Sequence, residues 1–186
     1  MSHGSLIFTP GPGEPPPLPP LIERLRGIGF LGAPLEQGGF LVGERFMQLV
    51  SFMGCSPFLQ LEPPADGSDR FCRILFDGPL PRPRVHPDRS GRPPRCPHCR
   101  GAVSEWRERF KGEGEIACRH CGGVQTLDSL DWGRYAGAGR LFMEVREIYP
   151  GDGTPSDTLL ACLQDAGTGW HWFWHGGGSP SAIDRL

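Results

Sequence analysis

The sequence predicts an α+β fold: a small, mainly antiparallel sheet with two or three helices, into which a small module is inserted. Apolar residues at helical spacing and residues alternating as in strands occur both before and after a cysteine-rich stretch in mid-chain. Each flank has only roughly 60 residues, which is too few for a comfortable core of its own. We therefore expect the two flanks to pair into one layered domain, for which 186 residues suffice.

The N-terminal flank opens with a proline-rich segment. Residues 10–20 hold seven prolines, a composition that favours an extended polyproline II conformation, so we assign residues 1–20 to a flexible arm. Apolar residues at helical spacing then predict a helix over about 20–28. A second apolar stripe predicts a helix over 46–53, closed by Gly54 as its C-cap.

Two strands are predicted before the middle of the chain, over residues 57–62 and 70–76, around a turn-like segment. Residues 79–95 break this pattern with six prolines and five arginines, which indicates a stiff, basic linker. Residues 21–78 would then form the first part of the α+β domain.

The second part of that domain spans residues 140–186. A strand is predicted over 141–149, and Thr154, followed by a proline, predicts the N-cap of a helix that Gly167 closes. The last strand, residues 170–175, places Trp170, Trp172 and Trp174 on one face. This tryptophan stripe either packs under a helix or stacks on a ligand.

Four of the seven cysteines form two C-x-x-C pairs, Cys96 with Cys99 and Cys118 with Cys121. Zinc takes four thiolates in a tetrahedron, and each C-x-x-C turn can place two sulfurs on one side of the ion. Glycine follows each pair within two residues, where a sharp turn needs a positive φ. We expect one Zn²⁺ ion with these four protein ligands, and a structural ion, because four thiolates leave no open position for catalysis.

Residues 96–121 resemble four-cysteine zinc ribbons, with rubredoxin-like iron knuckles as relatives. We assign residues 96–130 to an inserted ribbon of this kind, whose hairpin would pair 103–110 with 115–117. Iron, or a redox-active cysteine pair, remains an alternative to zinc. Such ribbons occur in nucleic-acid enzymes, in assembly factors and as structural clips, so the resemblance implies metal binding and leaves the function open.

The net charge of −2 hides an asymmetry, since ten basic and five acidic residues lie between Arg82 and Cys121. A mildly basic module on an acidic body favours an anionic partner, although a solvated arginine-rich linker would have the same composition. In a nucleic-acid complex, basic side chains would contact phosphates and an aromatic ring would stack on a base. The partner-binding residues expected on this basis are Arg92, Arg95, Arg107, Arg109, Lys111 and Trp106.

These features predict a non-enzymatic binding or assembly protein that recognises either a nucleic acid or a protein partner through the ribbon and the basic linker. Two alternatives stay open. One is a metal-handling maturation factor with a second, labile site. The other is an enzyme whose site is assembled from residues scattered along the chain.

The sequence also bears on where the protein works. No stretch approaches the ~20 apolar residues of a membrane span, and the N-terminus shows no signal-peptide pattern. An odd number of cysteines, four of them in metal-binding spacing, fits a reducing compartment, so we expect the cytoplasm. The remaining Cys55, Cys72 and Cys162 lie at helix ends or in apolar runs, as buried cysteines do.

Overall fold

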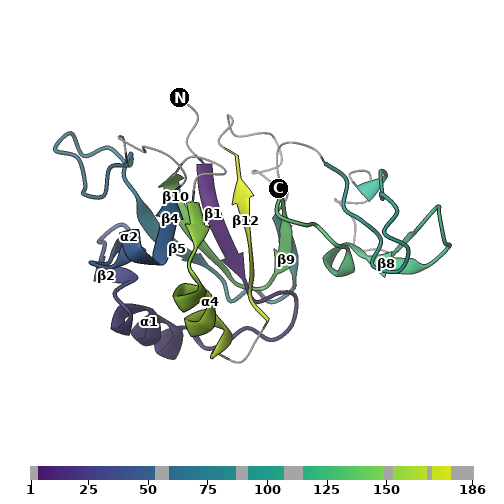
Figure 1. The fold of residues 1–186 in the computed structure, drawn as a ribbon, viewed down its shortest axis with the longest axis horizontal. Coiled ribbons are helices and arrows are strands. Elements are labelled where there is room, and N and C mark those ends of the chain that lie inside the picture. The colour runs from purple at the N-terminus through teal and green to yellow at the C-terminus, as the bar shows by residue number, and fades with distance from the viewer. Residues whose placement is uncertain are drawn as a thin grey trace.

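The computed structural model describes residues 4–52, 59–86, 92–106, 115–148, 153–166 and 169–176. Helices and antiparallel sheets are combined in them, which confirms the α+β class (Figure 1). None of the helices in these ranges has the length and apolarity that a bilayer crossing requires. The elements are β1 (Gly4–Thr9), α1 (Leu18–Gly27), β2 (Leu31–Pro34), β3 (Phe40–Val42), α2 (Phe46–Leu49), β4 (Val50–Phe52), β5 (Arg73–Asp77), β6 (Arg84–His86), β7 (Glu115–Ala117), β8 (Val124–Thr126), the 3₁₀ turn η1 (Leu127–Ser129), β9 (Gly137–Gly139), β10 (Phe142–Ile148), β11 (Gly153–Pro155), α4 (Asp157–Gln164) and β12 (His171–His175).

The main sheet has six strands in the order β12-β1-β10-β5-β3-β2, and neighbouring strands are antiparallel. Its centre joins the two flanks of the chain, because β5 precedes the cysteine-rich segment and β10 follows it. The register pairs Asp77 with Phe142 and Ile74 with Val145. A second, two-stranded sheet also joins the flanks, where β11 pairs with β4.

Strand β1 corrects the assignment of residues 1–20 to a flexible arm. Gly4–Thr9 lies between β10 and β12, and all six of its residues are buried. Leu6 and Phe8 point to the core on one face, while Ser5 and Ile7 point to the other. The strand was missed because its alternation of side chains is short and a proline-rich segment, residues 10–20, follows directly after it.

Helices α1 and α4 lie together below the sheet in Figure 1 and cover one of its faces. Helix α1 begins close to the predicted position, and prolines are tolerated in its first turn. Helix α4 is capped by Ser156, whose Oγ accepts the N–H of Leu159 at 3.3 Å. The predicted cap, Thr154, is wrong because that residue pairs with β4 as part of β11.

Two further predictions fail at their boundaries. The predicted helix over 46–53 ends at Leu49, because Val50–Phe52 leaves the helical path to pair with β11. Residues 59–62 of the predicted strand 57–62 have no strand pairing, whereas the strand predicted over 70–76 occurs as β5. Positions 53–58, which include Cys55 and Gly54, and Gly167 lie outside the described residues.

The tryptophan stripe belongs to the core. Trp170 and Trp172 are buried, and Trp174 packs against the same cluster while its indole N–H donates to the carbonyl of Gly153 at 2.8 Å. The stripe therefore faces the helices instead of presenting a platform for ligands. The main core consists of Leu6, Phe8, Leu21, Leu25, Phe30, Leu31, Phe46, Leu49, Val50, Cys72, Ile74, Leu141, Met143, Val145, Ile148, Leu159, Leu163, Trp170 and Trp172.

Strands β6 and β9 pair with each other and form what we call the stalk, which leads from the main sheet to the cysteine-rich module at the right of Figure 1. Val85 and Ala138 belong to the apolar cluster of that module. The two glycines of β9 approach the main sheet closely. A Cβ at Gly137 would lie 2.5 Å from the ring of Phe173, and one at Gly139 would overlap the hydroxyl of Thr9.

We predict that Gly139→Ala destabilises the protein by about 1–3 kcal/mol, because the added methyl group must push β9 away from β1. The measurement is the free energy of unfolding in urea. Gly13→Ala is the matched control, since a Cβ at Gly13 has no atom within 4 Å. A change below about 0.5 kcal/mol for Gly139→Ala, as expected of an open surface position, would contradict the close packing of the stalk.

Candidate metal centre

Two equivalent turns build the cysteine site. In the first, the N–H of Cys96 donates to the carbonyl of Gly101 at 2.9 Å, and the N–H of Arg100 donates to the carbonyl of Cys96 at 2.8 Å. In the second turn, the N–H of Cys118 donates to the carbonyl of Gly123 at 2.9 Å, and the N–H of Gly122 donates to the carbonyl of Cys118 at 2.8 Å. Each turn thus holds its two sulfurs on one side of a common point.

The residue after the second cysteine of each turn has a left-handed backbone. Gly122 has φ of 71° and Arg100 has φ of 63°. Glycine adopts this conformation without strain, whereas an arginine there raises the free energy of the backbone. The ion pair between Arg100 and Asp131, with N···O of 3.0 Å, helps to hold the strained position.

The four sulfurs of Cys96, Cys99, Cys118 and Cys121 all lie within 4.8 Å of one another. The Sγ atoms of Cys96 and Cys121 are 3.8 Å apart, and those of Cys99 and Cys118 are 3.6 Å apart. In a tetrahedron with metal–sulfur bonds of about 2.3 Å, the sulfurs stand about 3.8 Å apart. The predicted convergence of these cysteines is therefore confirmed, and the arrangement can hold a metal ion.

The electrostatics of the site favour a cation at its centre. The N–H groups of His120 and Cys121 point at the Cys118 sulfur and lower the pKa of that thiol to about 6. The pKa of Cys99 is instead raised to about 12: the N–H of Gly101 lowers it, but partial desolvation of the thiolate and the contacts with the other three sulfurs outweigh that bond. Four thiolates so close together repel one another, and a divalent cation removes that repulsion.

His98 and His120 lie inside the two turns and are exposed. Each ring packs against the opposite turn: a Cβ built at Gly101 would lie 2.5 Å from Cδ2 of His120, and one at Gly123 would lie 3.1 Å from Cδ2 of His98. Two glycines thereby make room for two imidazoles. The cysteines supply a complete tetrahedral set of ligands without them.

A small apolar cluster, which we call the ribbon core, supports the site. It includes Cys96 and Cys118, and Trp106 meets Trp132 edge to face with ring centroids 5.0 Å apart. Trp106 is only 5 % exposed, so its assignment as a base-stacking residue is wrong. Within the described part of the chain, the buried members of the ribbon core are Val85, Cys96, Val103, Trp106, Ile116, Cys118, Leu130, Trp132, Ala136 and Ala138.

The hairpin of the module differs from the predicted one. Glu115–Ala117 pairs with Val124–Thr126, so that the hairpin encloses the second cysteine turn. The first turn is closed by a single bridge between Arg95 and Ala102. The predicted partner segment, 103–110, lies outside the described residues from position 107 onward.

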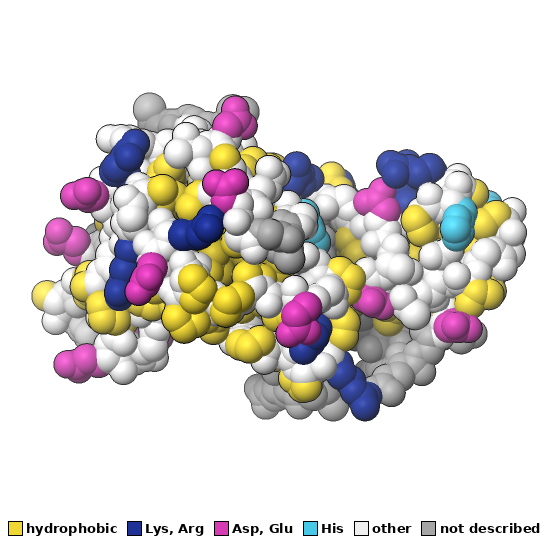
Figure 2. Space-filling view, turned by 90° about the horizontal axis from the view of Figure 1, so that it is seen from below, with side chains coloured by type: hydrophobic (Ala, Val, Ile, Leu, Met, Phe, Trp, Pro, Cys, Tyr) yellow, Lys and Arg dark blue, Asp and Glu magenta, His cyan; other side chains and the backbone are white. Residues whose placement is uncertain are grey.

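The basic residues of the module are only partly available to a partner. Arg119 pairs with Glu105 at 2.7 Å, and Arg100 pairs with Asp131. Arg92 lies over the ring of Tyr135, 4.1 Å from its centroid, and Arg95 is exposed. Arg107, Arg109 and Lys111 lie outside the described residues. Figure 2 shows acidic and basic side chains interspersed on the module, at the right of that view.

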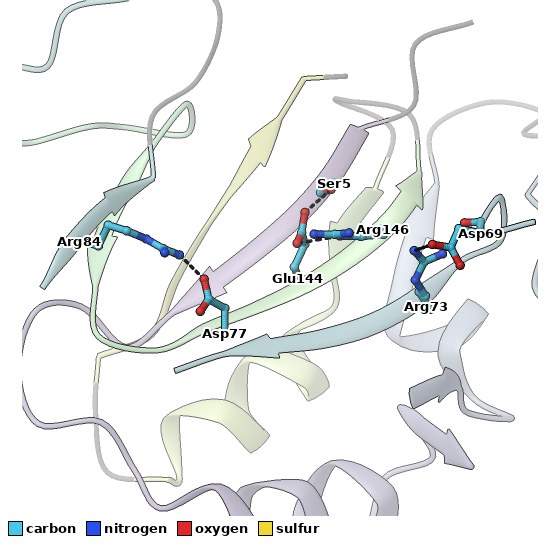
Figure 3. A network of polar contacts seen from close by, with 7 residues as sticks. All are labelled: Ser5, Asp69, Arg73, Asp77, Arg84, Glu144 and Arg146. Carbon is cyan, nitrogen blue, oxygen red and sulfur yellow. Dashed lines mark hydrogen bonds and ion pairs between the residues drawn. The ribbon is translucent and has the colours of Figure 1, made fainter. Parts of the chain in front are cut away.

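A concave surface separate from the metal centre lies on the face of the main sheet opposite the helices. It is a cavity of about 350 Å³ lined by Asp77, His86, Glu144 and Arg146 over an apolar floor. The Ser5 hydroxyl donates to Glu144 at 2.7 Å and Arg146 pairs with the same carboxylate at 2.9 Å, while Arg84 pairs with Asp77 (Figure 3). Both carboxylates are thus held in polar contacts within the face, as in structural networks.

Sequence reasoning missed several residues that shape these sites. Trp132 fills the ribbon core and Asp131 ties its segment to the first cysteine turn, although both lie beyond the cysteines in sequence. The signal available was the Asp131-Trp132-Gly133 turn, in which the Asp131 carboxylate accepts the N–H of Gly133 at 3.0 Å. Glu144 and Arg146 were detectable as alternate positions of a predicted strand.

In comparisons with known proteins, no family model, no curated protein and no solved structure matches this chain.

We predict that Gly101→Ala weakens metal binding by about 1–3 kcal/mol, because the new Cβ would crowd the His120 ring and lie 3.3 Å from the Cys99 sulfur. Competition against a coloured chelator measures the affinity. The double variant Gly101→Ala/His120→Ala should recover most of the loss, since it removes the crowded ring. If His120→Ala alone abolished metal binding, the assignment of four cysteines as the only protein ligands would be wrong.

Proposed function

We propose that the four cysteines hold one structural Zn²⁺ ion and that the protein is a non-enzymatic binding or assembly protein. We further propose that its ribbon recognises a protein partner. The observation that carries the metal assignment is the set of sulfur–sulfur distances, 3.6 and 3.8 Å across the two pairs, in turns whose N–H groups point at sulfur. Cys99 and Cys121 lie at the surface, which suits Zn²⁺ because that ion has no redox chemistry to shield from solvent.

A structural role for the ion follows from the size of the ribbon core. Among the described residues of the module and the stalk, the ribbon core has ten buried members, two of which are proposed metal ligands, and this is a small core. Modules of this kind need additional stabilisation from a disulfide or a bound metal. Zinc in zinc-finger peptides contributes on the order of 10–16 kcal/mol to folding. Four thiolates also complete the coordination sphere, so the ion would stabilise the module and would have no open position for a substrate or a catalytic water.

The surface of the ribbon favours a protein partner over a nucleic acid. Trp106 is buried, and two of the arginines are neutralised by Asp131 and Glu105. Val124, in the hairpin, is 55 % exposed. A nucleic-acid surface has an excess of positive charge, and the two ion pairs reduce that excess on the described part of the ribbon.

We also propose the domain organisation that goes with this function. Strand β1 together with residues 21–78 and 140–186 would form one α+β domain. Residues 79–95 would form the linker, and residues 96–130 the recognition module. A site with reduced thiols suits the cytoplasm, where we propose that the protein works.

The metal assignment predicts a ratio close to one zinc per chain. Elemental analysis by mass spectrometry after dialysis measures it, and Cys99→Ser should lower the ratio sharply, because a hydroxyl replaces one of four thiolates. Cys162→Ser, at a half-buried cysteine of α4, is the matched control and should keep the ratio. Iron in place of zinc, or a ratio near zero in the unaltered chain, would overturn the assignment.

The partner assignment predicts that the protein binds random DNA and RNA oligonucleotides negligibly, even at about 50 mM salt, in gel-shift titrations. Binding that falls steeply between about 50 and 200 mM salt would favour nucleic acid, because each neutralised phosphate releases counterions. In pull-downs, Val124→Asp should lose a partner protein that Met47→Asp retains. Met47, on α2, is 51 % exposed and lies outside the ribbon, so it controls for the added charge.

A further inference from the structure

Strand β12 is an outer strand of the main sheet, and Arg134 contacts its outer edge. The N–H of Trp174 donates to the backbone carbonyl of Arg134 at 3.2 Å. The Arg134 side chain also binds β12: its Nη1 donates to the carbonyl of Trp172 at 3.0 Å. Its guanidinium carbon also lies 3.9 Å from the centroid of the Trp172 ring. We call these three contacts the Arg134 clasp.

The clasp occupies backbone groups at the outer edge of β12 that an additional strand would otherwise pair with. An outer strand exposes N–H and C=O groups that can pair with any extended chain, and folded proteins block such edges. Successive amides of a strand point to opposite sides, so the amide of Phe173 is directed at β1 and that of Trp174 at the edge. The protection of the Trp174 amide from hydrogen exchange therefore depends on the clasp and not on the pairing of β12 with β1.

Arg134 is positioned by the ribbon. Two residues earlier, Trp132 is buried in the ribbon core with Cys96 and Cys118. Asp131 exchanges two backbone hydrogen bonds with Arg95, at 2.8 and 2.9 Å, and its carboxylate pairs with Arg100. Gly133, with φ of 60°, turns the chain between these anchors and the clasp.

We propose that metal binding by the ribbon closes the free edge of β12 through the Arg134 clasp, and that loss of the metal opens this edge while the main sheet stays folded. The inference rests on the proposed metal site. Without the metal, the four sulfurs no longer hold the two cysteine turns together, and the ribbon core loses two of its buried members. The segment that ends in Arg134 then loses its anchors, whereas the main core contains none of the four cysteines.

Hydrogen exchange at single amides, followed by NMR on the full chain, tests the proposal. The chain is compared with zinc bound and after removal of zinc by a chelator under reducing conditions. We expect exchange of the Trp174 amide to become at least about tenfold faster without zinc. The amides of Phe173 and of Val145, which lies in β10 between two paired strands, should stay slow. Unchanged exchange at Trp174, or equal acceleration at all three amides, would overturn the proposal.

A variant tests the clasp while zinc is bound. Arg134→Ala should accelerate exchange at Trp174 with the zinc ratio still close to one, because it removes the two side-chain contacts with Trp172. Arg140→Ala is the matched control, since Arg140 also donates to a backbone carbonyl, that of Leu80 at 2.8 Å, and touches no part of β12 in the described contacts. An Arg134→Ala chain with slow exchange at Trp174 would refute the clasp.

The two hypotheses can fail separately. A chain that carries no zinc contradicts the proposed function. One zinc per chain, together with exchange at Trp174 that does not depend on zinc, contradicts only the closure of the edge.

Discussion

The antiparallel pairing of β5 with β10 is the contact on which the rest of the structure depends. It joins segments that lie on either side of the cysteine-rich module, and its last pair, Asp77 with Phe142, stands next to the stalk. Because the chain leaves and returns at neighbouring points, the module can be inserted without interrupting the sheet. The same pairing places Glu144 and Arg146 on the face opposite the helices, where Ser5 of β1 completes their network.

Two apolar clusters of unequal size follow from this arrangement. The main core lies between the sheet and helices α1 and α4, and the ribbon core lies around two of the cysteines. The stalk connects them through side chains and through close backbone approach. The His86 ring lies 5.7 Å from that of Phe142, Arg84 pairs with Asp77, and Gly137 and Gly139 leave no space for a Cβ against β12 and β1.

The parts of the structure that the sequence predicted are those with strong local signals. The C-x-x-C spacing predicted the convergence of Cys96, Cys99, Cys118 and Cys121, and periodicity predicted α1, β5, β10 and β12. The failures come from non-local pairing. Val50–Phe52 and Gly153–Pro155 become strands because each meets the other, and nothing in either segment alone indicates it. Trp106 was assigned to a surface because its partner, Trp132, is 26 positions away in sequence.

The distribution of stability between the two cores bears on function. Segments that respond to ligands belong to the less stable parts of a protein, because a small free energy must suffice to change them. In this chain we expect that part to be the ribbon, because its core includes two cysteines of the proposed metal site. Among the described residues, the main core has nineteen buried members, and none of them is one of the four cysteines of the metal site. Recognition by the ribbon and control of the β12 edge would thus share one source of free energy, the binding of a single cation to four thiolates. A partner that docks on the folded ribbon would favour the metal-bound state, and by linkage it would tighten metal binding by the same factor.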